Sequence, residues 1–276
     1  MGSSLAPIVI TDSITRIGDE TAGAVVVSGS HGGIYAAYLA ARLGVAAAIF
    51  NDAGVGRDRA GIAGLDYLGL LGIPAAAIGH RTARIGDGAD MMARGVITHA
   101  NALAAALGCR PGLDCRTAAA ALQCAEPRVG EPPQALEGVF ALIAEPPAVW
   151  ALDSASAVGP EHVGCVIVTG SHGGLLGGRP ETALKYDALA ALYNDAGIGI
   201  DEAGTSRLPA LDRRGIAAAT VAAASARIGD ARSTYNDGIV SRVNTCAAAL
   251  GMAPGITARE FVAIVRSAKS HTGRRP

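Results

Sequence analysis

The sequence predicts an α/β protein with mostly parallel sheets and helices on both faces, built from two homologous repeats related by a pseudo-twofold axis. Three observations predict this fold. Short apolar runs such as residues 23–27 are bounded by glycines and polar turns, they alternate with longer helical stretches, and the same motifs return later in the chain. Strands that are apolar on both faces and alternate with helices are typical of a parallel sheet covered on both sides.

The expected strands of the first repeat are apolar runs that are too short for a helix, and helices are expected in the longer apolar stretches between them. Gly108 is a typical C-terminal stop for the last of these helices. In chain order we expect strands at 7–11 and 23–28, a helix at 34–43, a strand at 45–50, a loop and helix within 58–71, a strand at 73–78 and a helix at 90–107. The second repeat follows the same order, but its first helix is disrupted by Gly-Gly-Arg-Pro at 177–180.

The duplication is visible as three motifs that recur at nearly constant spacing. Ser-Gly-Ser-His-Gly-Gly at 28–33 returns at 169–174 with Thr in first place, Asn-Asp-Ala-Gly-Val-Gly at 51–56 returns at 194–199 with Ile for Val, and Ala-Arg-Ile-Gly-Asp at 83–87 returns at 226–230. Such ordered repetition indicates two copies of one structural unit.

These matches divide the chain into an α/β repeat at 7–122 and a second at 148–266. The proline-rich segment 123–147 is typical of a connector, with one apolar stretch at 135–144 that could form a helix. The polar end of the chain, 267–276, is expected to be a flexible tail.

Composition excludes several classes of protein. Half of the 276 residues are hydrophobic and 17% are charged, which excludes intrinsic disorder. The net charge is −1 and only 4% of residues are aromatic, so we expect no nucleic-acid partner. No apolar run approaches the roughly 20 residues that span a bilayer, so we expect no membrane partner.

The cysteines and the start of the chain bear on localisation. Five cysteines fit no zinc-ligand spacing and are odd in number, so we expect reduced thiols. The first residues, Met-Gly-Ser-Ser, lack the charged start and apolar stretch of a signal peptide. Together these features predict a cytoplasmic protein.

Each repeated motif follows the carboxyl end of an expected strand. In open parallel α/β sheets, ligands bind in the crevice at that edge. The polar residues of the motifs are therefore expected to converge on one site.

The Ser-His-Gly-Gly motif suggests acid–base chemistry. His31 and His172 are the candidate catalytic acids or bases, and the loop around each could bind substrate and stabilise an oxyanion through backbone amides. The loop residues in question are Ser30, Gly32, Gly33, Ser171, Gly173 and Gly174. The alternative is a tight turn in which each histidine is satisfied locally.

The Asn-Asp motif supplies carboxylates at the next strand end. Asp52 and Asp195 are candidate catalytic residues that orient or assist the histidines, and Asn51 and Asn194 are candidate substrate ligands. The alternative is an Asx-turn, for which both residue types are well suited.

The Ala-Arg-Ile-Gly-Asp motif offers an arginine. Arg84 and Arg227 could grip a substrate carboxylate, or they could form internal ion pairs that fasten the loop. His80 is a further candidate substrate ligand, and it is replaced by Ala223 in the second copy. Such differences predict either one working copy or one composite site to which each half contributes differently.

A strand that ends in Ser30-His31-Gly32, followed by a strand that ends in a short polar turn, resembles the layout of caspase-type cysteine peptidases. The resemblance covers two short segments and implies a His–Cys dyad. Asp52 or Asp195 stands where the cysteine would be, which argues against that family's chemistry.

The sequence thus predicts a small-molecule enzyme, first of all a hydrolase of a small polar carboxylate, cyclic amide or lactone. The alternatives are a lyase or isomerase that uses the same groups, or a non-catalytic protein that binds a small molecule. We expect no organic cofactor, because a base and an oxyanion hole suffice for water attack. The His and Asp residues leave room for a divalent metal, and a homo-oligomer is expected.

Overall fold

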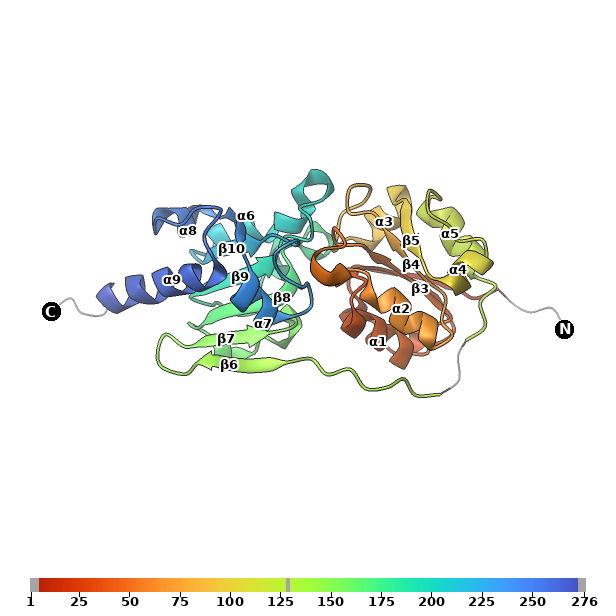
Figure 1. Cartoon of the computed structure of the whole chain (residues 1–276), viewed down its shortest axis with the longest axis horizontal. Coiled ribbons are helices and arrows are strands. Elements are labelled where there is room, and N and C mark those ends of the chain that lie inside the picture. Colours follow the sequence, from red (N-terminus) through yellow and green to blue (C-terminus); the bar gives the residue numbers. More distant parts are fainter. Residues whose placement is uncertain (1–4, 128–129, 273–276) are drawn as a thin grey trace.

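The computed structural model describes residues 5–127 and 130–272. It is an α/β protein with two mixed, mostly parallel sheets, which lie in two halves side by side (Figure 1). This confirms the predicted α/β class with mostly parallel sheets. Residues 1–4, on which the expectation about a signal peptide depends, lie outside the described residues.

The first half holds a five-stranded sheet in the order β1-β2-β3-β4-β5, in which only β5 runs antiparallel to its neighbour. The strands are β1 (Ile8–Thr11), β2 (Val25–His31), β3 (Ala47–Asn51), β4 (Ala75–Ile78) and β5 (Ile97–Ala100). The helices are α1 (Ile34–Arg42), α2 (Ala63–Leu70), α3 (Gly88–Arg94), α4 (Ala102–Ala106) and α5 (Cys115–Leu122).

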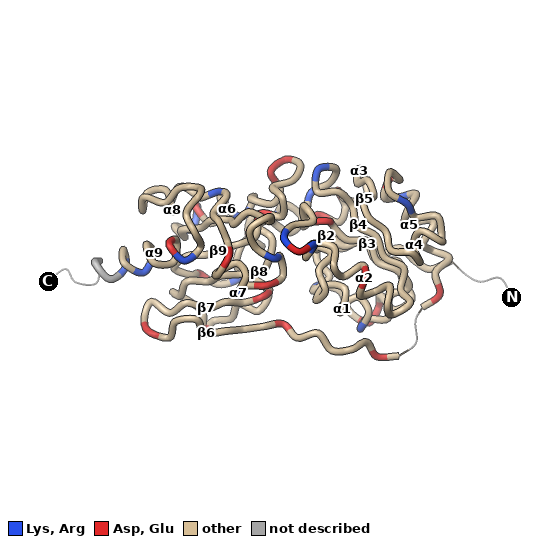
Figure 2. The backbone as a smooth tube through the Cα atoms, viewed as in Figure 1, with Lys and Arg blue, Asp and Glu red and all other residues tan. Residues whose placement is uncertain are grey.

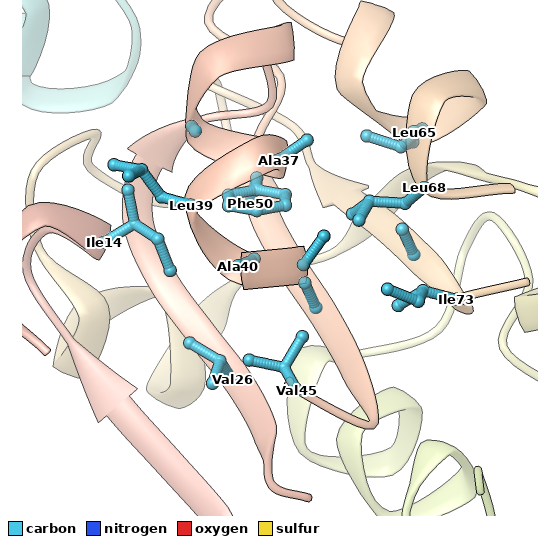
Figure 3. Packing of buried hydrophobic residues seen from close by; sticks show 14 of the residues in the cluster. Ile14, Val26, Ala37, Leu39, Ala40, Val45, Phe50, Leu65, Leu68 and Ile73 are labelled. Atoms are coloured by element: carbon cyan, nitrogen blue, oxygen red, sulfur yellow. The ribbon is translucent and has the colours of Figure 1, made fainter. Parts of the chain in front are cut away.

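Alternate residues of the first sheet pack on opposite faces. On one face Val26 and Phe50 meet Ala37 of α1 and Leu68 of α2 (Figure 3). On the other face Val25, Val27 and Ile49 pack under α3 and α5. Burial on both faces explains why the central strands read as unbroken apolar runs.

The second half holds a six-stranded sheet in the order β11-β10-β9-β8-β7-β6, with antiparallel strands at both edges. Its strands are β6 (Val139–Ile143), β7 (Val149–Leu152), β8 (Val166–His172), β9 (Ala190–Asn194), β10 (Ala217–Val221) and β11 (Val240–Val243). Its helices are α6 (Arg207–Asp212), α7 (Ala231–Asp237), α8 (Thr245–Ala249) and α9 (Ala258–Thr272).

Short 3₁₀ turns fill several connections. They cover Ile14–Arg16, Asp19–Thr21, Arg57–Arg59, Ala155–Ala157, Pro160–His162, Leu176–Gly178, Pro180–Thr182 and Ile200–Thr205. Two of these turns replace the helix that the Gly-Gly-Arg-Pro sequence was expected to disrupt in the second half.

Three expected elements differ in the structure. The single helix expected at 90–107 is α3, β5 and α4, because Gly95 ends α3 and Asn101 caps α4. The stretch at 135–144 is mainly strand β6, which pairs with β7 and so belongs to the second sheet. Much of the expected tail continues α9, and only 273–276 lies outside the described residues.

The two halves meet through matched backbone hydrogen bonds. The Arg57 amide donates to the Ala223 carbonyl at 2.8 Å, and the Ile200 amide donates to the His80 carbonyl at 2.9 Å. In the sequence alignment of the halves, Arg57 corresponds to Ile200 and His80 to Ala223, so the two bonds join equivalent positions in reciprocal order. The junction thus brings the strand-end loops of both sheets together.

Candidate functional site

The two repeated histidines border one cavity between the halves. His31 ends β2 and His172 ends β8, and both line a hollow of about 390 Å³. Each imidazole reaches toward the opposite half: a Cβ built on Gly229 would lie 3.3 Å from His31 Cε1, and one on Gly86 would lie 3.2 Å from His172 Cε1. The expectation that these histidines converge agrees with this geometry.

Both imidazoles are held in the same tautomer. The Gly33 amide donates to His31 Nδ1 at 3.1 Å, and the Gly174 amide donates to His172 Nδ1 at 3.2 Å. A neutral imidazole whose Nδ1 accepts a hydrogen bond carries its proton on Nε2. Each ring can therefore donate a hydrogen bond from Nε2, whereas the lone pair on Nδ1 already accepts the glycine amide.

Burial keeps both rings neutral. It lowers the pKa of His31 to about 4. Burial also lowers the pKa of His172 well below its usual value, helped by the charge of nearby Arg207. At neutral pH these histidines suit the role of hydrogen-bond donors to a carbonyl oxygen or oxyanion better than that of a base.

The glycine amides do not form the expected oxyanion hole. Gly32 donates to the Asn51 carbonyl at 3.0 Å, and Gly173 donates to the Asn194 carbonyl at 2.8 Å. The amides that follow them, of Gly33 and Gly174, are bonded to the histidine rings. These four donors are already bonded within the protein, so they are not available to an oxyanion.

Ser30 and Ser171 do line the cavity. Ser30 Oγ accepts the Ile14 amide at 3.0 Å, and Ser171 Oγ accepts the Ala155 amide at 2.8 Å. Each hydroxyl hydrogen stays free to donate to a ligand. These two serines therefore fit the expected role in substrate binding.

The asparagines are structural. Asn51 and Asn194 are fully buried. Asn51 donates to the Ala83 carbonyl at 3.3 Å and accepts the Ala53 amide at 2.9 Å. Asn194 makes the equivalent bonds. They close the Asx-turns that were the alternative, and neither residue lines the cavity.

The repeated aspartates do not orient the two histidines of the cavity. Asp52 Oδ1 lies 2.8 Å from His80 Nδ1, and Asp52 Oδ2 accepts the Thr98 hydroxyl at 3.0 Å. Burial alone would raise the pKa of Asp52, but hydrogen bonds from His80 outweigh it and lower the pKa. Neither Asp52 nor Asp195 lines the cavity of His31, so the expected single cluster is divided.

The motif arginines bind aspartates rather than lining the cavity. Arg84 Nη2 pairs with Asp201 at 2.9 Å, and Arg227 Nη1 pairs with Asp58 at 3.0 Å. Both pairs cross between the halves, where Figure 2 shows basic and acidic segments side by side. The pairs within the motif, which were the alternative, are present as well, with Arg84 3.8 Å from Asp87 and Arg227 3.3 Å from Asp230. The pairs between the halves fasten the junction.

Sequence reasoning missed the most unusual residue of the cavity. Arg207 begins α6 and is only 5% exposed. Its Nε donates to the Gly174 carbonyl at 2.9 Å, and Nη1 donates to the carbonyls of Thr182 and Ala183. No carboxylate of the described chain pairs with it, and its guanidinium carbon lies 5.0 Å from the centre of the Tyr193 ring. Burial without a counter-ion lowers its pKa.

The missing helix of the second half makes room for Arg207. Its amide donates to the Gly173 carbonyl at 2.9 Å, just as the Gly64 amide donates to the Gly32 carbonyl at 2.8 Å. In the first half a Cβ on Gly64 would lie 2.6 Å from Ala37 Cβ of α1, so no side chain fits. Open turns replace α1 in the second half, and the guanidinium occupies that space.

Other charged residues complete the cavity wall. Arg16 and Lys185 are exposed cations on its lining, and Glu137 and Asp153 are half-buried acids. Burial raises the pKa of both carboxyls. Glu137 Oε1 is buried and has no hydrogen-bond partner among the residues that the structure describes. Glu137 comes from the proline-rich segment, where no motif signalled it.

Two kinds of feature are absent from the residues that the structure describes. Among them, no three His, Cys, Asp or Glu side chains are grouped to hold a metal ion. Among the same residues, every helix is too short or too polar to cross a membrane.

Comparison with known proteins found no family model, no curated protein and no solved structure that this chain matches. The geometry of the cavity is therefore the basis of the function proposed below.

Proposed function

We propose that the chain is a small-molecule enzyme with one composite active site in the cavity between the halves. Its substrate would be a small anionic molecule with a carbonyl group, such as a carboxylate-bearing lactone or cyclic amide, and the reaction hydrolysis. The observation that carries this proposal is Arg207, a buried guanidinium without a counter-ion, in the same cavity as two neutral histidines. A buried unpaired charge is costly, and a substrate anion would relieve that cost.

The roles follow from the chemistry of each group. Arg207 Nη2 binds the substrate carboxylate, and the Nε2–H groups of His31 and His172 donate to the carbonyl oxygen as it becomes negative. Glu137 is the candidate general base, because its raised pKa and unpaired oxygen suit it to take a proton from water. The sequence predicted that these histidines act as acids or bases, and the role that we propose instead is hydrogen-bond donation to the substrate carbonyl.

A direct test incubates the protein with a panel of carboxylate-bearing lactones and cyclic amides and measures the ring-opened product by chromatography. Arg207→Met should weaken substrate or product binding by roughly tenfold to a hundredfold, the value of a charge-assisted hydrogen bond. Arg214→Met is the matched control, because Arg214 also bonds a backbone carbonyl and lies outside the cavity. Equal binding by wild type and Arg207→Met would refute the anion site.

One observation favours a second candidate reaction. A base such as Glu137 facing a carbonyl polarised by Nε2–H groups could also abstract a proton next to that carbonyl, as in an isomerase or lyase. Incubation in D₂O separates the reactions, because proton abstraction places deuterium in recovered substrate and hydrolysis does not. In either case Glu137→Gln should lower kcat by about 10²–10⁴.

We also propose that the halves are duplicated copies around a pseudo-twofold axis. The matching strand order of β1–β5 and β7–β11 and the reciprocal bonds at the junction support this. If the site is composite, His31→Asn and His172→Asn should each lower turnover by about 10²–10³. If each variant instead keeps half of the activity, the halves work independently.

A further inference from the structure

A second hollow lies at the same junction and shares no lining residue with the histidine cavity. It is a cleft of about 510 Å³, bordered by His80, Arg81 and Asp195 and floored by small residues such as Ala223 and Gly197. It contains groups that the proposed hydrolase does not use.

His80 faces this cleft with a free lone pair. Its Nδ1 lies 2.8 Å from Asp52 Oδ1, and its backbone amide donates to the same oxygen at 2.9 Å. A ring that donates from Nδ1 to a carboxylate carries, when neutral, its lone pair on Nε2. That atom would lie 3.1 Å from a Cβ built on Gly197, which places it against the second half.

The equivalent position in the second half lacks the imidazole. Asp195 Oδ1 accepts the amides of Gly197 and Ala223, each at 2.9 Å, as Asp52 Oδ1 accepts those of Gly54 and His80. The Ala223 side chain cannot bond Asp195 as the His80 ring bonds Asp52. Part of the cleft is the space that a second imidazole would fill.

Asp195 is consequently left with an unpaired oxygen. In the first half Thr98 donates to the second oxygen of Asp52, but its counterpart Ser241 donates to the Thr220 carbonyl instead. Asp195 is 4% exposed, and its Oδ2 has no hydrogen-bond partner among the described residues. Asp195 is almost fully buried and borders the cleft, so a carboxylate oxygen that lacks a donor among the described residues points to a ligand that supplies one.

We propose that this cleft binds a small zwitterion, such as an amino acid, through its ammonium group. Asp195 and His80 both border the cleft, and their acceptors Oδ2 and Nε2 make no hydrogen bond within the described chain, which favours a ligand rich in N–H donors. Arg81 is exposed at the rim and forms no ion pair within the described chain, so it can hold the ligand's carboxylate. The other rim cation, Arg57, is already bonded to the Ser225 carbonyl at 2.8 Å.

The test follows the Gly197 and Ala223 amides in two-dimensional ¹H–¹⁵N spectra, because both donate to Asp195. Glycine and β-alanine should shift these peaks, propylamine should do so roughly tenfold more weakly, and propionate should not. Asp195→Asn keeps an acceptor for both amides but loses the charge, and it should weaken binding at least tenfold. Glu202→Gln removes an exposed acid outside the cleft and should bind as the wild type does.

Ala223→His provides a second, independent variant. Its imidazole should fill the cleft, pair with Asp195 as His80 pairs with Asp52, and abolish the shifts. The proposal is overturned if neither amino acid shifts the two amides, or if Asp195→Asn or Ala223→His binds as tightly as the wild type. Propylamine binding as tight as that of glycine would remove Arg81 from the site. None of these outcomes depends on Arg207 or on turnover.

Discussion

Replacement of His31 by Asn should make the protein less sensitive to acid. The ordinary imidazole pKa of 6.5 applies to the unfolded chain, and burial lowers the folded value to about 4. Between these values the unfolded state binds a proton that the folded state does not, so stability is greatest above pH 6.5 and falls as the pH drops toward 4. At about 1.4 kcal/mol per pH unit, His31 alone costs the wild type about 2 kcal/mol between pH 7 and pH 5.

Asparagine does not titrate, and its Oδ1 can still accept the Gly33 amide. Urea unfolding at pH 7 and pH 5 should therefore show a loss of stability about 2 kcal/mol smaller in His31→Asn than in the wild type. His172→Asn should act in the same direction, because the pKa of His172 is also lowered. Long-range ¹H–¹⁵N spectra of the rings supply the independent measurement. A His31 titration midpoint near 6.5, or a proton on Nδ1, would refute the donor role that we assign to this ring.

Two further predictions concern the junction and the thiols. Gly54 has φ 73° and a built Cβ would lie 2.9 Å from backbone of the second half, so Gly54→Ala should cost more than about 2 kcal/mol of unfolding free energy in chemical denaturation. Gly72→Ala, with φ 79° but nothing within 4 Å, should cost only about 1 kcal/mol, and equal costs would argue against close packing at the junction. A thiol reagent should modify exposed Cys124 in the native protein and spare Cys109 and Cys115, because burial raises their pKa values to about 11 and about 12. Rapid native modification of either buried thiol, detected by peptide mass mapping, would contradict this.

The strands that the sequence predicts best are those whose local pattern and tertiary position agree. Residues 25–27 and 47–50 are apolar throughout because helices cover both faces of their sheet, so burial leaves a direct trace in the sequence. Strand β5 leaves no such trace. Ile97–Ala100 lies at a sheet edge and mixes polar with apolar residues, and only its pairing with β4 makes it a strand. Strand β6 is apolar throughout, which is equally typical of a buried helix, and its pairing with β7 makes it a strand.

The candidate site was harder to predict, because the repeated residues and the specialised residues have different functions. Repetition identifies what the fold needs in both halves: the Asn51 turn is buried structure, and the Arg84 motif holds the junction. The charged groups that form no ion pair within the described chain lie where the two halves differ.

Arg207 stands where the first half has Gly64, and Asp195 has lost its imidazole because Ala223 replaces His80. Each exchange opens space at the junction, and each leaves there a charged side chain that forms no ion pair within the described chain. A sequence comparison can list such exchanges, but it cannot tell which of them face a cavity, because that depends on how the two halves dock. The differences between the two halves are therefore the better guide to ligand binding, and the motifs that both halves share are the better guide to folding.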